Sequence, residues 1–260
     1  MSQRPSIYLP SGNEQTIFQA AARQGLPVLL KGPTGCGKTR FVQSMAESLG
    51  RPLFTVACHE DLTAADLVGR FLLQGGETRW VDGPLTRAVR AGGICYLDEV
   101  VEARADTTVV IHPLADHRRE LNIERIGETM QAPPDFMLVL SYNPGYQSVL
   151  KDLKPSTRQR MVAIELNYPT AEIERRILQQ ETGASPELAD RLVRLGQAIR
   201  QLEGEGLAEV ASTRALVSTA ALVQAGVTLL DAASSAIALP LSDDPTMTRQ
   251  LRALIQRYVE

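Results

Sequence analysis

The sequence predicts an α/β domain built on a parallel sheet, followed by a small domain made only of helices. Short apolar runs, as expected of buried strands, alternate with segments of helical periodicity up to about residue 167. A glycine-rich loop joins the first apolar run to a helix. From Thr170 onward only helical periodicity is present. Alternating strands and helices, followed by helices alone, indicate two domains at residues 1–167 and 168–260.

Apolar runs and turn residues locate the individual elements. We expect buried strands at residues 27–30, 53–57, 93–97, 136–141 and 162–166. We expect helices at residues 13–24, 41–49, 61–67, 85–91, 106–114, 170–182, 186–202, 213–225, 229–238 and 245–259. Two β-hairpin insertions interrupt the alternation, one at residues 69–81 around Gly75-Gly76 and one with arms at 120–123 and 126–130.

Residues 32–39 fit the pattern G-x-x-x-x-G-K-[ST] of a phosphate-binding loop. In such a loop the backbone N–H groups and the helix dipole favour the phosphates, Lys38 reaches the β- and γ-phosphates, and the Thr39 hydroxyl binds Mg²⁺. We therefore predict ATP and Mg²⁺ as cofactors. The predicted nucleotide-binding residues are Gly32, Pro33, Thr34, Gly35, Cys36, Gly37, Lys38, Thr39 and Arg40.

Polar side chains at the ends of two later strands extend the predicted site. Asp98 ends an apolar run and is suited to hold the Mg²⁺ bound through Thr39. Glu99 is suited to polarise the water that attacks the γ-phosphate. Asn143 follows another apolar run, and we expect it between Asp98 and the phosphate loop, where it can hydrogen-bond that water or the γ-phosphate. A turn-forming role for Asn143 in Asn-Pro-Gly remains an alternative.

Three arginines complete the set of candidate catalytic residues. Arg158 and Arg160 precede the last strand, and we expect them to lie too far round the sheet to serve their own subunit. They are therefore predicted to act on the nucleotide of a neighbouring subunit, as an arginine finger does. Arg214 opens a helix of the second domain and is predicted to reach over the bound phosphates. Surface salt bridges are the alternative role for these arginines.

Composition narrows the possible functions. The chain of 260 residues has a net charge of −3 and an isoelectric point near 5.8, so we expect neither a nucleic-acid nor a membrane partner. No apolar stretch has the length and polarity of a signal peptide or a membrane span. Three scattered cysteines predict neither a disulfide framework nor a zinc site. We expect a soluble protein of the reducing cytoplasm.

The order of these motifs resembles that of AAA+ ATPases, and the two hairpin insertions resemble the MoxR branch. Three segments are very similar to the CbbQ/NirQ/NorQ family, and we judge CbbQ members to be the most similar within it. These segments are residues 31–42, residues 96–104 and residues 141–147.

The resemblance implies a hexameric ring that hydrolyses ATP to ADP and phosphate and remodels a client protein. It implies an adaptor with a von Willebrand factor A domain, of the CbbO type, and rubisco as the client that is reactivated. It also implies that the two hairpin insertions touch the client or the partner near the ring pore.

Other functions remain open at this stage. The same motor could serve the maturation or activation of nitric-oxide reductase, as NorQ and NirQ members do. A small-molecule P-loop kinase would need an acceptor site but no arginine from a second subunit. A nucleotide-gated scaffold would bind ATP without turnover, and the presence of Glu99 and Asn143 argues against it.

Overall fold

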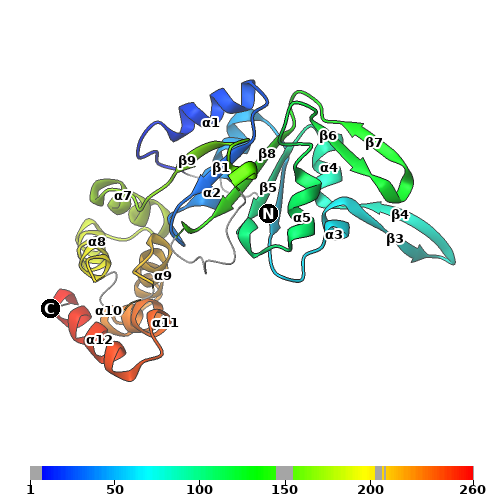
Figure 1. Cartoon of the computed structure of the whole chain (residues 1–260). Coiled ribbons are helices and arrows are strands. Elements are labelled where there is room, and N and C mark those ends of the chain that lie inside the picture. Colours follow the sequence, from blue (N-terminus) through cyan, green and yellow to red (C-terminus); the bar gives the residue numbers. More distant parts are fainter. Residues whose placement is uncertain (1–7, 145–154, 203–206, 208, 260) are drawn as a thin grey trace. The chain divides into compact units, whose positions relative to one another are not determined.

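The computed structural model describes residues 8–144, 155–202, 207 and 209–259 (Figure 1). Contacts within the chain define two compact units. The first contains residues 1–33 and 38–166, and the second contains residues 34–37 and 167–260. The first is an α/β unit with a five-stranded parallel sheet and two small hairpins, and the second is helical. The predicted fold class is confirmed.

The α/β unit alternates strands and helices as its apolar pattern predicts. In chain order it contains α1 (Glu14–Arg23), β1 (Val28–Lys31), α2 (Lys38–Leu49), β2 (Leu53–Ala57), α3 (Ala64–Val68), β3 (Gly69–Gln74), β4 (Glu77–Asp82), α4 (Pro84–Ala91), β5 (Ile94–Asp98), η1 (Val100–Glu102), α5 (Ala105–Ile111), β6 (Glu120–Ile123), η2 (Glu124–Ile126), β7 (Glu128–Gln131), β8 (Met137–Tyr142), α6 (Pro155–Arg158) and β9 (Val162–Glu165).

The order of the strands brings the predicted site residues to one edge of the sheet. The strands lie in the order β2-β5-β8-β1-β9, and every neighbouring pair is parallel. The phosphate loop follows β1, Asp98 ends β5, and Asn143 follows β8, which lies between those two strands. Because the strands are parallel, their carboxyl ends share an edge, which is where ligands bind in open α/β sheets.

The side chains of the central strands alternate between the two faces of the sheet. Leu29, Leu97 and Leu140 belong to a buried cluster that also contains residues of α3, α4 and α5. Tyr96 and Ser141 lie one residue out of phase with that set, so they project from the opposite face. Asp98 is two residues beyond Tyr96 and shares its face. The β5 face opposite the cluster therefore carries the acid that ends the strand.

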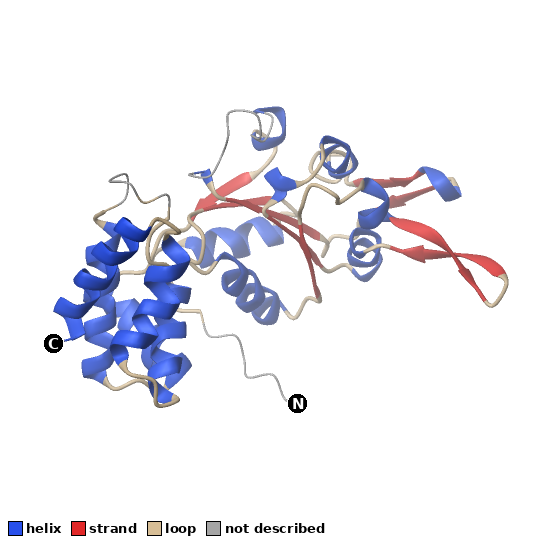
Figure 2. Ribbon diagram, turned by 90° about the horizontal axis from the view of Figure 1, so that it is seen from below, coloured by secondary structure: helices blue, strands red, loops and turns tan. Residues whose placement is uncertain are grey.

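Both predicted hairpins are present as separate two-stranded sheets, β3–β4 and β6–β7. They extend from the same end of the α/β unit (Figures 1 and 2). Phe71 and Trp80 face each other across the first hairpin, with ring centroids 5.3 Å apart. Near its turn, Leu73 is 75% exposed. This hairpin thus holds its strands together with an aromatic pair while leaving an aliphatic side chain in solvent.

Several element boundaries differ from the sequence predictions. Helix α3 begins at Ala64 rather than at residue 61, because Thr63 and Asp66 form a capping box that fixes its first turn. Helix α5 ends at Ile111 rather than at residue 114, where Pro113 offers no N–H to continue it. Ile126 belongs to the short turn η2 and not to the second hairpin arm. The short helix α6 and the turn η1 were not predicted.

The helical unit forms around its own buried cluster. It contains α7 (Ala171–Thr182), α8 (Pro186–Arg200), α9 (Thr213–Gln224), α10 (Leu229–Ala233), the π-helical turn η4 (Ser234–Ala238), α11 (Leu239–Leu241) and α12 (Pro245–Val259). Ser185, Ser212 and Thr170 cap α8, α9 and α7 through their side-chain oxygens. Within the described residues no helix is long and apolar enough to cross a bilayer.

A buried ion pair fixes the start of α9. The Glu174 carboxylate is fully buried and accepts two hydrogen bonds from the Arg200 guanidinium, at 2.9 and 2.7 Å. It also accepts one from the Thr213 hydroxyl at 2.6 Å, and Arg200 donates to the Ala211 carbonyl at 2.8 Å. These bonds hold Ala211 and Thr213, the residues on either side of Ser212, which caps α9.

Removing one partner of this ion pair should be costly. Glu174→Ala leaves the Arg200 guanidinium, only 14% exposed, without its carboxylate. We expect the free energy of unfolding, measured by urea denaturation and circular dichroism, to fall by about 3–5 kcal/mol. The control is Arg194→Ala, which breaks an exposed pair with Asp190 and should cost at most about 1 kcal/mol. Equal losses in both variants would contradict this account.

Candidate functional site

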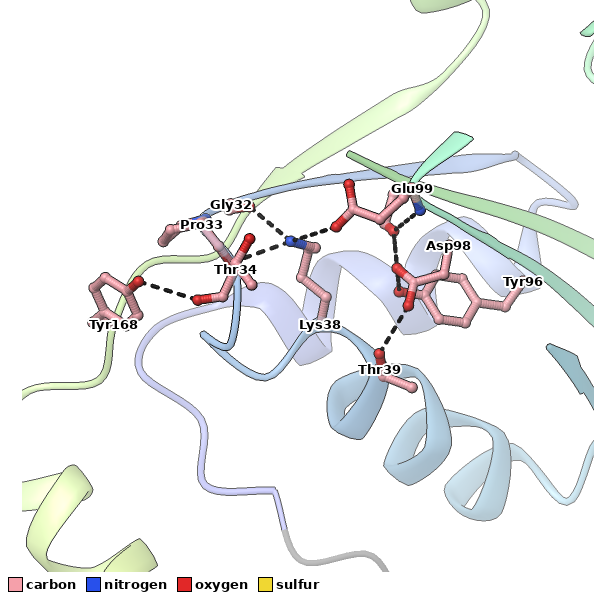
Figure 3. A network of polar contacts seen from close by, with 10 residues as sticks. Gly32, Pro33, Thr34, Lys38, Thr39, Tyr96, Asp98, Glu99 and Tyr168 are labelled. Carbon is pink, nitrogen blue, oxygen red and sulfur yellow. Dashed lines mark hydrogen bonds and ion pairs between the residues drawn. The ribbon is translucent and has the colours of Figure 1, made fainter. Parts of the chain in front are cut away.

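The phosphate loop joins the end of β1 to the start of α2, as the sequence predicts. Gly35 and Gly37 have φ angles of +72° and +106°, a backbone region that favours glycine. The Lys38 ammonium is buried and donates to the carbonyls of Gly32 at 2.8 Å and Pro33 at 3.2 Å (Figure 3). The N-terminus of the twelve-residue helix α2 adds free backbone N–H groups and a partial positive charge. Together these features suit a phosphate group.

The Thr39 hydroxyl and the Asp98 carboxylate meet at the edge of this loop. Thr39 Oγ1 donates to Asp98 Oδ2 at 3.2 Å (Figure 3). No cluster of three or more His, Cys, Asp or Glu able to hold a metal occurs among the described residues. Mg²⁺ bound with a nucleotide does not need one, since it takes one or two protein oxygens together with phosphates and waters. A hydroxyl beside a carboxylate fits that donor set.

Glu99 takes an unusual backbone conformation that turns its side chain toward Lys38. Its φ and ψ angles of 53° and 49° lie in the left-handed region, which is uncommon for residues other than glycine. The Glu99 carboxylate lies 3.6 Å from the Lys38 ammonium. Partial burial raises the pKa of Glu99; the charge of Asp98 raises it further, and the charge of Lys38 opposes the shift. A carboxylate with a raised pKa is a stronger base toward a water molecule.

Two hydroxyl groups that sequence reasoning missed also contact Asp98. Tyr96 and Ser141 are both fully buried. The Tyr96 hydroxyl donates to Asp98 Oδ1 at 2.7 Å, and the Ser141 hydroxyl donates to the same oxygen at 2.5 Å. Ser141 Oγ in turn accepts a hydrogen bond from the backbone N–H of Glu99 at 3.2 Å. The available signal was a hydroxyl-bearing residue in each of two largely apolar strands, on the same face as the acid.

Asn143 lies directly after the central strand β8 and is 6% exposed. Its place between the strand of Asp98 and the strand that leads to the phosphate loop is the one expected from the sequence. The segment 141–147, which resembles the family, includes residues 145–147, and these lie outside the described residues. The position of Asn143 is compatible with its predicted contact to water or phosphate, which stays a prediction.

Arg158 ends the short helix α6, and Arg160 precedes β9 by two residues. Strand β9 is the direct neighbour of β1, so these arginines are not far round the sheet, contrary to expectation. They are separated from the loop along the strands instead, because Val162 pairs with Val28 at the amino end of β1. Four residues of strand span about 13 Å. The two arginines therefore lie toward the opposite edge of the sheet from the phosphates.

The tip of the phosphate loop, residues 34–37, belongs to the same compact unit as the helices. A side chain at Gly35 would come within 2.6 Å of Ser212 Cβ and 3.5 Å of Arg214 Cβ, so glycine permits the close approach of α9. The Tyr168 hydroxyl donates to the Thr34 carbonyl at 3.1 Å (Figure 3). Arg214 is thus in the first turn of a helix that starts beside residues 34–37, and its predicted reach over the phosphates stays a prediction.

Comparison with known proteins extends these observations. Residues 27–161 match the family model of the AAA domain (dynein-related subfamily), and residues 174–258 match that of the CbbQ/NirQ/NorQ C-terminal region. The fold is similar to that of RuvB from Thermotoga maritima, with a TM-score of 0.60 and 14% identity, covering 95% of this chain and 71% of that one. The AAA domain implies ATP binding and ATPase activity.

Several relatives match nearly the whole chain, among them NirQ, NorQ and CbbQ proteins. The denitrification regulatory protein NirQ of Pseudomonas aeruginosa is 61% identical, over 100% of both chains. Protein NorQ of Paracoccus denitrificans is 60% identical, over 95% of this chain and 92% of the relative. Protein CbbQ of Hydrogenophilus thermoluteolus is 55% identical, over 96% and 93%. The judgement that CbbQ members are the most similar is therefore not supported. The chain belongs to the CbbQ/NirQ/NorQ family of AAA ATPases.

Proposed function

We propose that this protein is a Mg²⁺-dependent ATPase motor that acts in the maturation or activation of nitric-oxide reductase. The observation that supports the chemistry is the meeting of Thr39 and Asp98 beside the Lys38 ammonium, with Glu99 adjacent. The client is supported by the greater identity to NirQ and NorQ than to CbbQ. We place the motor in the cytoplasm.

Each residue of the site has a separate task in this proposal. Lys38 and the loop N–H groups bind the phosphates, and Thr39 and Asp98 hold Mg²⁺. Mg²⁺ held by these two residues would supply positive charge against the phosphate oxygens. Glu99 accepts a proton from the attacking water, and Asn143 orients that water. The products are ADP and phosphate.

Reactivation of rubisco is the second candidate function, and the 55% identity to a CbbQ protein favours it. The motor would be the same and only the client would change. A small-molecule kinase is disfavoured, because the chain belongs to a family of AAA ATPases over both of its units.

A partner surface is part of the proposal. The exposed large apolar residues of the two hairpins are Phe71, Leu73, Val81 and Ile126. Both hairpins extend from the same end of the α/β unit (Figure 2). We assign them to contact with the client or with an adaptor that carries a von Willebrand factor A domain, in a hexameric ring. Apolar side chains held in solvent on a paired hairpin suit such a contact.

The client can be identified by trapping the motor in its ATP-bound state. Glu99→Gln protein should bind ATP without hydrolysing it and should retain its partners in an extract of the native cells. We expect an adaptor with a von Willebrand factor A domain together with nitric-oxide reductase. Lys38→Ala protein, which should not bind ATP, serves as the control bait. Recovery of the adaptor with rubisco would support the second candidate, and recovery of neither client would contradict both.

Arg158 and Arg160 are proposed to act on the nucleotide of a neighbouring subunit, since they lie toward the far edge of the sheet from their own loop. An arginine finger contributes roughly 10³–10⁵ to turnover. Arg160→Ala subunits mixed with Glu99→Gln subunits should regain ATPase activity, because one kind of mixed interface is intact.

The matched control mixes Glu99→Gln with Lys38→Ala subunits. Both of these changes disable a subunit's own site, so no interface is restored and no activity should return. Native mass spectrometry verifies that mixed assemblies form. Absence of recovery in the first mixture, with mixed assemblies present, would mean that Arg160 serves its own subunit.

A further inference from the structure

The acid that is suited to hold Mg²⁺ has two oxygens in different surroundings. Oδ2 of Asp98 accepts a hydrogen bond from Thr39, the other candidate metal ligand. Oδ1 accepts hydrogen bonds from the hydroxyls of Tyr96 and Ser141 (Figure 3 shows Tyr96). The two hydroxyl oxygens are themselves 3.1 Å apart. Oδ1 is therefore hydrogen-bonded to two buried hydroxyls, and Oδ2 is hydrogen-bonded to Thr39, which follows the phosphate-binding Lys38.

This arrangement depends on strand register. Tyr96 precedes Asp98 by two residues on β5, so both project from the same face. Ser141 reaches the same point from β8, because the parallel register pairs Leu97 with Leu140 and continues to Asp98 and Ser141. Both hydroxyl side chains are fully buried, in strands that are largely apolar. Buried hydroxyls are retained where they have a hydrogen-bond partner, and here that partner is the Asp98 carboxylate.

We propose that Tyr96 and Ser141 are positioning residues for Mg²⁺: their hydroxyls hold Oδ1 of Asp98 so that Oδ2 faces Thr39 and the metal. This inference rests on the Mg²⁺ role proposed above for Thr39 and Asp98. Groups that orient a metal ligand in this way typically change metal affinity by about 10- to 100-fold when they are removed.

Tyr96 and Ser141 differ in their other contacts, so removing each hydroxyl should have a different effect. The Tyr96 hydroxyl contacts Asp98 and Ser141 and also interacts with Thr39, so these contacts all lie within the proposed Mg²⁺ site. Ser141 also accepts the backbone N–H of Glu99, the proposed base, whose left-handed conformation this bond helps to hold. Loss of the Tyr96 hydroxyl should therefore weaken Mg²⁺ binding alone. Loss of the Ser141 hydroxyl should weaken Mg²⁺ binding and also lower kcat.

The first readout is binding and does not depend on turnover. In a Glu99→Gln background, the affinity for a fluorescent N-methylanthraniloyl-ATP is measured with Mg²⁺ and with EDTA. The ratio of the two dissociation constants gives the tightening by Mg²⁺. We expect Tyr96→Phe and Ser141→Ala each to reduce this ratio by about tenfold. Affinity in EDTA should stay unchanged, which shows that the phosphate loop is folded.

The second readout is ATPase activity at increasing Mg²⁺ with Glu99 intact. Tyr96→Phe should raise the half-saturating Mg²⁺ concentration about tenfold and reach the parental kcat at saturation. Ser141→Ala should raise it similarly and keep a lower kcat. The control is Tyr142→Phe, which removes a hydroxyl from a tyrosine buried in the cluster on the other face of the sheet. It should leave both readouts unchanged.

The outcomes distinguish the inference from the proposed function. If Mg²⁺ tightens nucleotide binding in the Glu99→Gln background but Tyr96→Phe keeps that ratio within twofold, the positioning role is overturned and the Mg²⁺ site stands. If that background itself shows no tightening by Mg²⁺, and Thr39→Ala also has no effect, the proposed Mg²⁺ site fails and the inference fails with it. Lower thermal stability with an unchanged ratio would mean that the hydroxyls only support the fold.

Discussion

The hydrogen bond between Thr39 and Asp98 is the interaction on which the proposed chemistry depends. It joins residues 59 positions apart, one in the first turn of α2 and one at the end of β5. The two can meet only because β8 separates β5 from β1 by a single strand, with all three carboxyl ends at one edge. That order also puts Asn143 and the Ser141 hydroxyl between them. The strand order therefore brings together the phosphate loop, the acids and the hydroxyls that contact Asp98.

The sequence predicted the elements that have local signals. The phosphate loop, the acid at the end of β5 and both hairpins follow from residue patterns within about a dozen positions. The contacts of Tyr96 and Ser141 could not be found that way, because they depend on which strands are neighbours and in what register. The same holds for α6, four residues long, and for the place of β9 beside β1. Where long-range pairing decides the outcome, local periodicity carries no information.

Each unit has its own arrangement of polar residues. The α/β unit supplies the acids and the base, while the helical unit holds the start of α9 through the buried Glu174–Arg200 pair. Arg200 also lies 4.2 Å from the ring of Tyr168, whose hydroxyl reaches the Thr34 carbonyl of the phosphate loop. In the proposed function the motor is the same for either client, so we propose that the choice of client comes from other surfaces. The exposed apolar residues of the two hairpins are the part of the α/β unit best suited to make that choice.

The most direct test of this account is a structure of assembled Glu99→Gln protein with ATP and Mg²⁺. The account predicts the triphosphate in the loop of residues 32–39 and Mg²⁺ at about 2.0–2.1 Å from Thr39 Oγ1. It also predicts that Asp98 Oδ2, and not Oδ1, faces the metal or a water bound to it. Mg²⁺ held away from both Thr39 and Asp98, or nucleotide bound elsewhere, would contradict it.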